Sequence, residues 1–362
     1  MKTANSPVTK SKDILSIKKI IVSGHENVVY CEDKDTGLKA IIAIHDTTLG
    51  PALGGTRMWN YSNKEDALND VLRLSRGMTY KAAISGLKLG GGKAVIIGDS
   101  KTQKDKKLMC KFGQFVDSLN GRYITAEDVG MSTKDMEYVR SETKYVTGIP
   151  ESMGGSRDPS PVTAYGVYMG MKAAAQFKWG NNNLKDKKIL IQGVGHVGEN
   201  LLMHLTNEGA SVIINDINKE HLTNISKKYN AKIALDENIY DLDIDIYAPC
   251  ALGATVNPDT ISRLKCDIIA GAANNQLADE DRDGKLCLDK GICYAPDFLI
   301  NAGGLINVYS EINGYDRDHS IQQTREIYDT TLEILKKADN EGIPTNDAAL
   351  KIAKQRISNK NK

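Results

Sequence analysis

The stretch Lys188-Ile-Leu-Ile-Gln-Gly-Val-Gly-His-Val-Gly198 decides the fold of this 362-residue chain. A short apolar run leads directly into a Gly-x-Gly-x-x-Gly pattern, which predicts a buried strand that ends in a tight turn. Residues 199–208 are helical in pattern, Gly209 ends them, and a second strand over 212–215 ends at Asp216. Strand, turn, helix, strand and an acidic residue 23 positions after the first glycine form the complete context of a dinucleotide-binding unit.

The glycines of this pattern let a pyrophosphate approach the N-terminus of the following helix, whose first N–H groups have no partner within the helix. Asp216 is expected to accept hydrogen bonds from the adenine ribose and to repel a 2′-phosphate, although Lys219 nearby could tolerate one. We therefore expect NAD rather than NADP, with an ordinary βαβ turn as the alternative. The cofactor contacts expected in this unit are Gly193, Val194, Gly195, His196, Val197, Gly198, Asp216 and Ile217.

A second informative stretch, Gly77 to Val95, places two lysines among small and apolar residues. Because an unpaired ammonium is costly to remove from water, Lys81 and Lys93 are expected either to pair with a bound anion or to have a lowered pKa suited to base chemistry. Three glycines, residues 90–92, precede the second lysine and are expected to let substrate and cofactor approach it. The alternative is that each lysine lies at the surface with its stem packed on apolar neighbours.

Short apolar runs alternate with helical patterns in the first half of the chain. They predict strands over 38–45, 94–97 and 123–126, and helices over 64–78 and 106–119. Three glycines and a proline within residues 49–56 predict an irregular segment there. Ser62 or Asn63 is the expected N-cap of the first helix.

The chain exceeds the usual size of one domain, and a proline- and glycine-rich segment, residues 148–161, divides it. We expect an α/β protein with a cleft between two domains: residues 1–148 for substrate binding, catalysis and oligomerisation, and a doubly wound Rossmann domain, residues 149–344. A C-terminal helix, about 345–362, is expected to pack back on the first domain. Ser160 is the expected cap of the helix after the break, with Pro161 in its first turn.

In doubly wound sheets, ligands bind beyond the carboxyl ends of the strands. Asn274 and Asn275 follow a short strand predicted over 267–270, so they are candidate contacts for the nicotinamide side of the cofactor. A purely turn-forming role is an equal alternative for both.

Composition narrows the class of protein. With 47 basic and 46 acidic residues the net charge is +1, which argues against nucleic acid or an anionic membrane as partner. Six cysteines without a Cys-x-x-Cys spacing favour reduced thiols over disulfides or a zinc site, so we expect no metal. No apolar run reaches membrane-spanning length and the first twenty residues lack an apolar signal core, so a cytoplasmic location and a short disordered extension before Ile14 are expected.

Several motifs in a fixed order resemble the glutamate/leucine/phenylalanine/valine dehydrogenase family, and most closely its leucine dehydrogenases, from about Tyr30 to about Ala353. They are Gly50-Pro-Ala-Leu-Gly-Gly-Thr-Arg57, Gly77-Met-Thr-Tyr-Lys81, Leu89-Gly-Gly-Gly-Lys93, Thr125-Ala-Glu-Asp-Val-Gly130, Pro161-Val-Thr-Ala-Tyr-Gly166, Ala248-Pro-Cys-Ala-Leu-Gly253, Gly271-Ala-Ala-Asn-Asn-Gln276 and Asn301-Ala-Gly-Gly304. The resemblance implies reversible oxidative deamination, in which an L-amino acid, NAD and water give a 2-oxo acid, ammonium and NADH. It also implies a homo-oligomer, with an octamer as the expected form.

The resemblance assigns roles to individual residues. Lys81 corresponds to the lysine that pairs with the substrate carboxylate, Lys93 to the catalytic lysine that activates water, and Asp128 to the acid that exchanges protons with the substrate nitrogen. A catalytic lysine needs a depressed pKa, and a nearby aspartate would raise it again. The resemblance further implies substrate contacts at Leu53, Gly54, Gly55, Met78, Ala126, Leu305 and Val308, and cofactor contacts at Thr163, Ala273, Asn274 and Asn301.

None of the residues expected around the substrate side chain is charged, which favours a branched-chain amino acid such as leucine, valine or isoleucine over glutamate. Leu305 stands where the leucine enzymes are expected to have valine, and its extra methylene would shift preference towards smaller side chains by about 1–3 kcal/mol at most. Lys88 and His196 are two further departures from the family pattern. Lys88 adds a cation that could perturb Lys93, whereas His196 is expected to face solvent or the cofactor phosphates.

Other activities are weighed against this one. A phenylalanine or valine dehydrogenase of the same family is the nearest alternative. A lysine Schiff-base enzyme, for example with pyridoxal phosphate, would also use desolvated lysines, but the nucleotide pattern argues against it. A non-catalytic NAD-binding homologue would have little reason to retain Lys81, Lys93 and Asp128 together.

Overall fold

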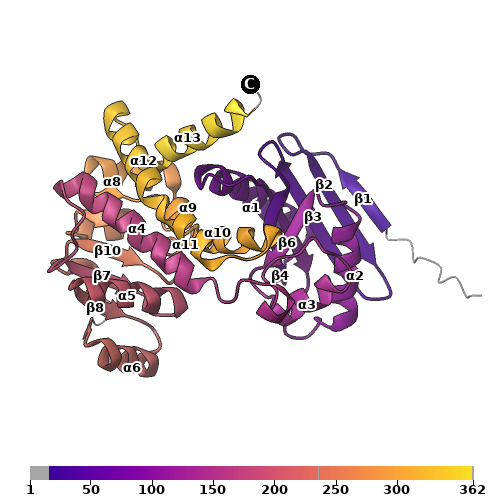
Figure 1. Cartoon of the computed structure of the whole chain (residues 1–362), viewed down its shortest axis with the longest axis horizontal. Helices are drawn as coiled ribbons and strands as arrows, with labels where there is room; N and C mark the ends of the chain where they lie inside the picture. Colours follow the sequence, from indigo (N-terminus) through magenta and orange to yellow (C-terminus); the bar gives the residue numbers. More distant parts are fainter. Residues whose placement is uncertain (1–15, 235, 361–362) are drawn as a thin grey trace, which may run out of the picture.

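The computed structural model describes residues 16–234 and 236–360. The extension expected before Ile14 lies outside the described residues. Two six-stranded sheets organise the chain, one in each lobe of the molecule in Figure 1. The expected two-domain α/β architecture is therefore confirmed.

The first sheet is mixed and has the strand order β1-β2-β3-β5-β4-β6. Strands β1, β2, β3 and β5 pair antiparallel, whereas β4 pairs parallel with both β5 and β6. Helix α1 packs on one face of this sheet, and α2 and α3 cover the other with Phe112, Phe115, Met136 and Val139. The elements are β1 Ser16–Ile20, β2 Asn27–Asp33, β3 Leu38–Asp46, β4 Ala52–Trp59, α1 Lys64–Ile84, β5 Gly90–Ile97, α2 Lys106–Asp117, β6 Tyr123–Glu127 and α3 Thr133–Arg140.

The prediction of an irregular segment over 49–56 is wrong, because β4 begins at Ala52 and is an internal strand of the sheet. Its glycines are tolerated there because neighbouring backbone fills the space that side chains would need. A Cβ at Gly54 would lie 1.7 Å from the carbonyl oxygen of Gly92. Glycine inside a strand pattern thus marks close backbone approach rather than a loop.

Helix α1 begins as predicted, with the Asn63 side chain accepting a hydrogen bond from the Asp66 N–H at 2.8 Å. It continues beyond the predicted end at Met78 to Ile84, so Lys81 lies on its last turns. Strand β5 is likewise longer than predicted, because it begins at Gly90 and contains all three glycines.

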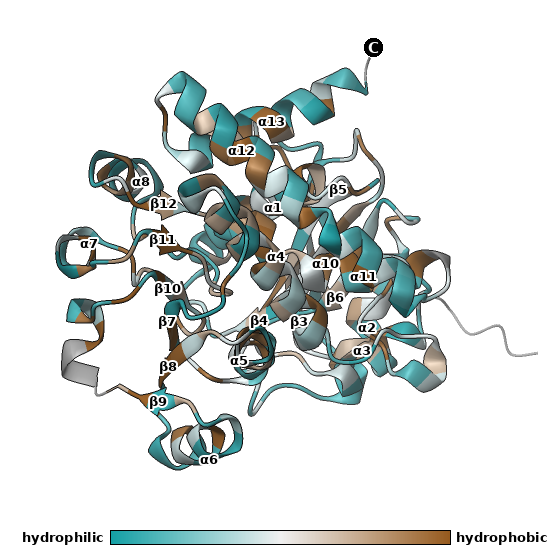
Figure 2. Ribbon diagram, turned by 60° about the vertical axis from the view of Figure 1, so that its left-hand side comes forward, coloured by the Kyte–Doolittle hydropathy of each residue, from teal (hydrophilic) through white to brown (hydrophobic). Residues whose placement is uncertain are grey.

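The second sheet is entirely parallel and has the order β12-β11-β10-β7-β8-β9, the arrangement of a doubly wound dinucleotide fold. Strands of this sheet such as β8 and β11 are hydrophobic, and are brown in Figure 2. Helix α6, at the edge of the sheet, has hydrophilic turns, which are teal. The strands are β7 Lys188–Gln192, β8 Ser211–Asn215, β9 Lys232–Ile233, β10 Ile246–Pro249, β11 Ile268–Ile269 and β12 Cys293–Tyr294. The helices are α4 Ser160–Trp179, α5 His196–Glu208, α6 Lys219–Tyr229, α7 Pro258–Arg263, α8 Glu280–Asp289, α9 Asp297–Ile300, α10 Gly303–Ser310, α11 Arg317–Arg325, α12 Ile327–Glu341 and α13 Thr345–Asn359. Three 3-10 turns complete the elements, at Glu151–Met153, Asp236–Asp241 and Glu311–Asn313.

The segment of residues 148–159, which leads into α4, is irregular apart from one 3-10 turn, Glu151–Met153. The Glu311 carboxylate holds it at two points, accepting hydrogen bonds from the N–H groups of Gly148 and Ser156, each at 2.9 Å. Ser160 does not cap α4, contrary to prediction. It is the first helical residue, and the Asp158 carboxylate accepts a hydrogen bond from its N–H at 2.9 Å.

The last helix, α13, returns to the first lobe and packs against α1 (Figure 1). Its apolar residues Ala348, Ala349, Ile352 and Ala353 belong to the same core cluster as Leu87 and Leu89. We propose to divide the chain near residue 148, with α13 serving as a strap between the two domains.

All six cysteines lie within the described residues and are free thiols. Among the described helices, none combines the length and apolar character needed to cross a bilayer.

Candidate active site

The pairing of three parallel strands gathers the predicted catalytic residues. In this register Thr56 lies opposite Ala94, and Gly55 lies opposite Ala126. Because side chains alternate between the two faces of a sheet, Lys93, Gly55 and Ala126 share one face. That face is the one covered by α1 rather than by α2 and α3.

Asp128 follows β6 and meets Lys93 on this face. The Lys93 Nζ lies 2.9 Å from Asp128 Oδ2, and the exposed fractions of the two side chains are 8% and 25%. Gly55 makes the approach possible, since a Cβ there would lie 2.8 Å from the Cβ of Asp128. The structure therefore brings together two residues that are 35 positions apart in the sequence.

Burial and charge oppose each other in this pair. Burial lowers the pKa of Lys93 below its usual value, although the nearby Asp128 carboxylate acts to raise it. Burial acts to raise the pKa of Asp128, but Lys93 and Arg57 outweigh it and the net shift is downward. A lysine with a lowered pKa beside an ionised carboxylate is suited to exchange protons near neutral to alkaline pH.

Lys81 lies at the junction between the two lobes. Its Nζ donates a hydrogen bond to Asn301 Oδ1 at 2.5 Å, although 220 residues separate the two in the sequence. Burial lowers the pKa of Lys81 to about 8, with Asp297 acting to raise it and Lys93 acting to lower it. Asn301 is held in turn by donating to Asn274 Oδ1 at 2.7 Å.

Asp297 was not predicted as a site residue, yet its carboxylate is 6% exposed and interacts electrostatically with Lys81. Its oxygens accept hydrogen bonds from the N–H groups of Gln276 at 3.0 Å and Phe298 at 2.7 Å. Burial raises its pKa, with these contacts and Lys81 acting in the opposite direction. The available signal was its position, three residues after the end of the short strand β12 of the parallel sheet.

The residues expected around the substrate side chain are apolar and clustered. Leu53 and Leu305 are buried, while Met78 and Val308 are partly buried against the same core cluster. Ala126, 7% exposed, lies on the adjoining strand β6. These five side chains are all apolar.

The three glycines before Lys93 are required by packing within the protein. A Cβ at Gly91 would lie 2.1 Å from the Thr79 nitrogen on α1, and one at Gly92 would lie 2.7 Å from the Tyr123 ring. These atoms occupy the space that we expected a ligand to use. The glycines therefore hold α1, with Lys81, close against β5, with Lys93.

The fingerprint turn has the geometry of a dinucleotide site. A side chain at Gly195 would meet no atom within 4 Å, whereas a Cβ at Gly198 would lie 2.0 Å from the Gly193 carbonyl oxygen. The second glycine thus leaves open space for a ligand and the third permits close packing of helix and strand. Asp216 accepts hydrogen bonds from the N–H groups of Val194 and Asn218, both at 2.9 Å. These residues fit a bound dinucleotide.

Several other predicted cofactor contacts lie around this turn. His196 begins α5 with its side chain 85% exposed, 3.5 Å from the Asp158 carboxylate. Ile217, after Asp216, is 92% exposed. Leu252, 76% exposed and not predicted, follows β10 in the same sheet. The remaining expected contacts Val197, Thr163 and Ala273 lie in α5, in the first turn of α4 and after β11.

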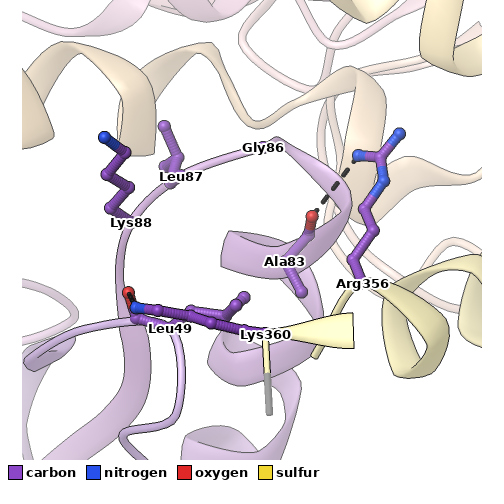
Figure 3. A pocket seen from close by; sticks show the side chains of 7 residues that line it. All are labelled: Leu49, Ala83, Gly86, Leu87, Lys88, Arg356 and Lys360. Carbon is purple, nitrogen blue, oxygen red and sulfur yellow. Dashed lines mark hydrogen bonds between the residues drawn. The ribbon is translucent and has the colours of Figure 1, made fainter. Parts of the chain in front are cut away.

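Lys88 lies outside the catalytic cluster. It is exposed and lines a cavity of about 260 Å³ between α13 and the loop that joins α1 to β5 (Figure 3). Arg356 and Lys360 reach across this cavity to the carbonyl oxygens of Ala83 and Leu49, at 3.4 and 2.9 Å. The charges of Asp128, Arg57 and Asp70 act on the Lys93 pKa, and Lys88 is not among the main causes of its shift.

Together, a parallel sheet with a dinucleotide turn in one lobe and a buried lysine–aspartate pair in the other are typical of a two-domain dehydrogenase. Comparison with known proteins identifies its family. The model described as Glu/Leu/Phe/Val dehydrogenase, dimerisation domain matches residues 25–145. The model described as Glutamate/Leucine/Phenylalanine/Valine dehydrogenase matches residues 154–218 and 214–362. The chain belongs to this family of amino acid dehydrogenases.

Individual relatives agree with this assignment. Leucine dehydrogenase of Bacillus subtilis (strain 168) is 54% identical over 92% of this chain and 91% of its own length. Leucine dehydrogenase of Thermoactinomyces intermedius is 53% identical over the same shares. The crystal structure of L-tryptophan dehydrogenase from Nostoc punctiforme superimposes with a TM-score of 0.85 at 47% identity, covering 93% of this chain and 97% of that one.

Proposed function

We propose that this protein catalyses the reversible, NAD-dependent oxidative deamination of a branched-chain L-amino acid to its 2-oxo acid and ammonium. The observation that carries the proposal is the buried Lys93–Asp128 pair, with Nζ and Oδ2 2.9 Å apart, on the sheet face that also holds an uncharged side-chain cluster. Leucine dehydrogenases at 53–54% identity support the substrate class.

Each charged residue has a task that follows from its position. Lys81, at the junction of the lobes, binds the substrate carboxylate, and Asn301 and Asp297 hold its ammonium in place. Asp128 accepts a proton from the substrate nitrogen. Lys93, whose pKa burial lowers, acts in its neutral form to remove a proton from the water that attacks the iminium carbon, and returns it in the amination direction.

NAD, when bound, supplies the hydride acceptor for the substrate Cα. The turn 193–198 and the N-terminus of α5 would hold its pyrophosphate, Asp216 its adenine ribose, and Asn274 its nicotinamide side. Thr163, near Gly304 at the start of α10, is a further contact in this proposal.

The apolar cluster favours a substrate side chain without charge, because a buried glutamate carboxylate would find no partner there. Leu305 is the residue that we expect to set side-chain size, since it is 7% exposed on α10. Phenylalanine and tryptophan are larger alternatives, and the tryptophan-acting relative has the same fold.

We further infer a homo-oligomer, formed through the first domain, and a cytoplasmic location. A family model described as a dimerisation domain supports the first inference. Six free thiols, four of them buried, support a reducing compartment. Mass measurement in solution tests whether the oligomer is the expected octamer.

The deciding experiment measures NADH formation with Leu, Val, Ile, Phe, Trp and Glu, and repeats each with NADP. We expect the largest kcat/KM for a branched-chain substrate with NAD. A preference for Phe or Trp would reassign the substrate within the family. No turnover with any of them, alongside measurable NADH binding, would indicate a non-catalytic homologue, and a visible absorbance band of the purified protein would indicate a Schiff-base enzyme.

A further inference from the structure

Behind the Lys93–Asp128 pair lies an ion network that the proposed mechanism does not use. Arg57, on β4, donates from Nε to Asp128 Oδ2 at 3.2 Å and from Nη1 to Asp70 Oδ2 at 2.9 Å. The Asp70 carboxylate, on α1, also accepts hydrogen bonds from the Tyr61 hydroxyl at 2.7 Å and from Arg73 at 3.1 Å. One guanidinium therefore bridges the catalytic aspartate to an anchored carboxylate.

The two oxygens of Asp128 are used unequally. Both Lys93 Nζ, at 2.9 Å, and Arg57 Nε, at 3.2 Å, contact Oδ2. Within residues 16–234 and 236–360, Oδ1 receives no hydrogen bond. A carboxylate that is fixed through one oxygen keeps its other oxygen available in a defined direction.

The bridge is itself firmly held. The Arg57 and Asp70 side chains are 23% and 16% exposed, so their pairing is partly shielded from solvent. Burial, followed by contact with Asp70, raises the pKa of the Tyr61 hydroxyl, which therefore remains a hydrogen-bond donor. A planar guanidinium can contact two carboxylates at once, which the single ammonium of lysine does less well.

We propose that Arg57, anchored by Asp70, is a positioning residue that fixes Asp128 through Oδ2 and leaves Oδ1 to receive the substrate nitrogen. The proposal rests on the amino acid dehydrogenase function proposed above. It assigns Arg57 no contact with substrate or cofactor. Its effect on the reaction passes through the orientation and charge of Asp128 and through Lys93.

Removing the guanidinium also changes the charges around both catalytic groups. Asp128 faces Lys93 on β5 and Arg57 on β4. Lys93 faces Asp128, Arg57 and Asp70, the last of which lies on α1. It also interacts electrostatically with Lys81, on the same helix. Tyr123 on β6 is a further titratable neighbour of Asp128. Arg57 lowers the pKa of both catalytic groups, so its loss raises both.

The test compares Arg57→Gln, Arg57→Lys and Asp70→Asn with the wild-type enzyme. For Arg57→Gln we expect kcat to fall by on the order of 100-fold through misplacement of Asp128, with little change in NADH affinity. The pH at which kcat/KM rises should move upward, because Lys93 must be neutral to act. Arg57→Lys should restore the position of the pH profile more fully than kcat. Asp70→Asn should lower kcat less than Arg57→Gln does, and because the Asp70 charge acts to raise the Lys93 pKa, its loss should move the pH profile downward instead of upward.

Lys172→Gln is the matched control, because it removes a similarly buried ion pair, Lys172–Glu208 at 2.6 Å, between α4 and α5 of the other lobe. It should lower stability without moving the pH profile. If Arg57→Gln resembles this control, with a lowered melting temperature and an unmoved profile, the positioning role is overturned.

A crystal structure of Arg57→Gln separates this proposal from the proposed function. We expect the Asp128 carboxylate to rotate so that Oδ2 no longer holds its present place, whatever the substrate of the enzyme is. An unchanged Asp128 in that structure would overturn the positioning role. Absence of amino acid oxidation by the wild-type enzyme would instead overturn the proposed function, and leave the structural result to decide the role of Arg57.

Discussion

The two lobes present their functional groups in opposite ways. In the first, Lys93 lies in the middle of a strand with its side chain 8% exposed and already paired with Asp128. In the second, the cofactor residues follow strand ends, and side chains such as His196 and Ile217 lie mostly in solvent. The electrostatics of the proposed catalytic pair are thus set by folding, whereas the residues proposed to bind the cofactor lie at the surface.

This difference has an energetic reason. Burying an ion pair costs a large desolvation free energy, which is offset only if the geometry of the pair is well fixed. The Arg57–Asp70 bridge and the glycines around Lys93 supply that fixed geometry. Backbone N–H groups at a helix terminus carry only partial charges. They can therefore be hydrated in the free protein and bind a phosphate without a large desolvation cost.

The largest expected effect belongs to the buried pair. Lys93→Ala should lower kcat by about 10³- to 10⁴-fold, because it removes the group that deprotonates water, while NADH binding measured by fluorescence stays near the wild-type value. Lys93→Met, which keeps the volume, should behave in the same way. Turnover near the wild-type rate in either variant would contradict the assignment of Lys93 as the base.

The next comparison uses one glycine from each lobe. Gly54→Ala should destabilise the protein by about 3 kcal/mol or more, because its Cβ would overlap the backbone of β5 at 1.7 Å. Gly195→Ala meets no atom within 4 Å. It should leave the free energy of unfolding within about 0.5 kcal/mol while it raises the Kd for NADH.

Urea unfolding and NADH titration on both variants separate the two outcomes. A destabilised Gly195→Ala variant, or a Gly54→Ala variant as stable as wild type, would contradict the conclusion that Gly54 is needed for packing whereas Gly195 is needed for ligand binding.

The same difference explains which parts of the molecule were predictable. The dinucleotide unit was predictable because strand, turn, helix and Asp216 are all local in sequence, and the structure has each of them. Strand β4 was missed because glycine and proline usually indicate loops, and only the neighbouring strands show why Gly54 is needed there.

The pairings between site residues were missed for a different reason. Arg57 and Asp128 are 71 positions apart, and Lys81 and Asn301, which was expected to contact the cofactor, are 220 apart, so pairing between them requires the tertiary fold. Lys81, Lys93 and Asp128 were predicted as site residues from their surroundings and from family motifs, and the structure pairs Lys93 with Asp128. Asp297 was visible only as an acidic residue after a strand, a position that many structural carboxylates share.

An effect of intermediate size is expected for Asp216 in the second lobe, which contains the dinucleotide turn. Asp216→Ser should increase the ratio of kcat/KM with NADP to that with NAD by roughly tenfold, because it removes the charge that would repel a 2′-phosphate. The Asp216 carboxylate also supports the N–H groups of Val194 and Asn218, so part of the affinity for NAD should be lost as well. Initial rates with both cofactors measure the ratio. An unchanged ratio would exclude Asp216 from the ribose site.

The smallest expected effect is on the pH dependence of stability, through two histidines that pack near α1 in the first lobe. His25 and His45 meet edge to face with ring centroids 4.9 Å apart, and His45 Nδ1 lies 2.9 Å from Thr79 Oγ1. Burial lowers the pKa of both imidazoles below the ordinary value, with Arg76 and the neighbouring histidine adding to the shift of His45. Both therefore favour the neutral form in the folded protein.

A histidine whose pKa is lower when folded stabilises the protein above its unfolded pKa of about 6.5, and that contribution is lost as the pH falls through the folded value. Wild-type stability should therefore decline more steeply than that of His45→Gln between pH 7.5 and 5.5, a range set by that unfolded value. Carboxylates with raised pKa values, such as Asp297, act in the opposite direction but equally in both proteins. The difference between the two proteins in urea unfolding at each pH isolates the histidine contribution, and equal slopes would show that His45 titrates alike in the folded and unfolded chains.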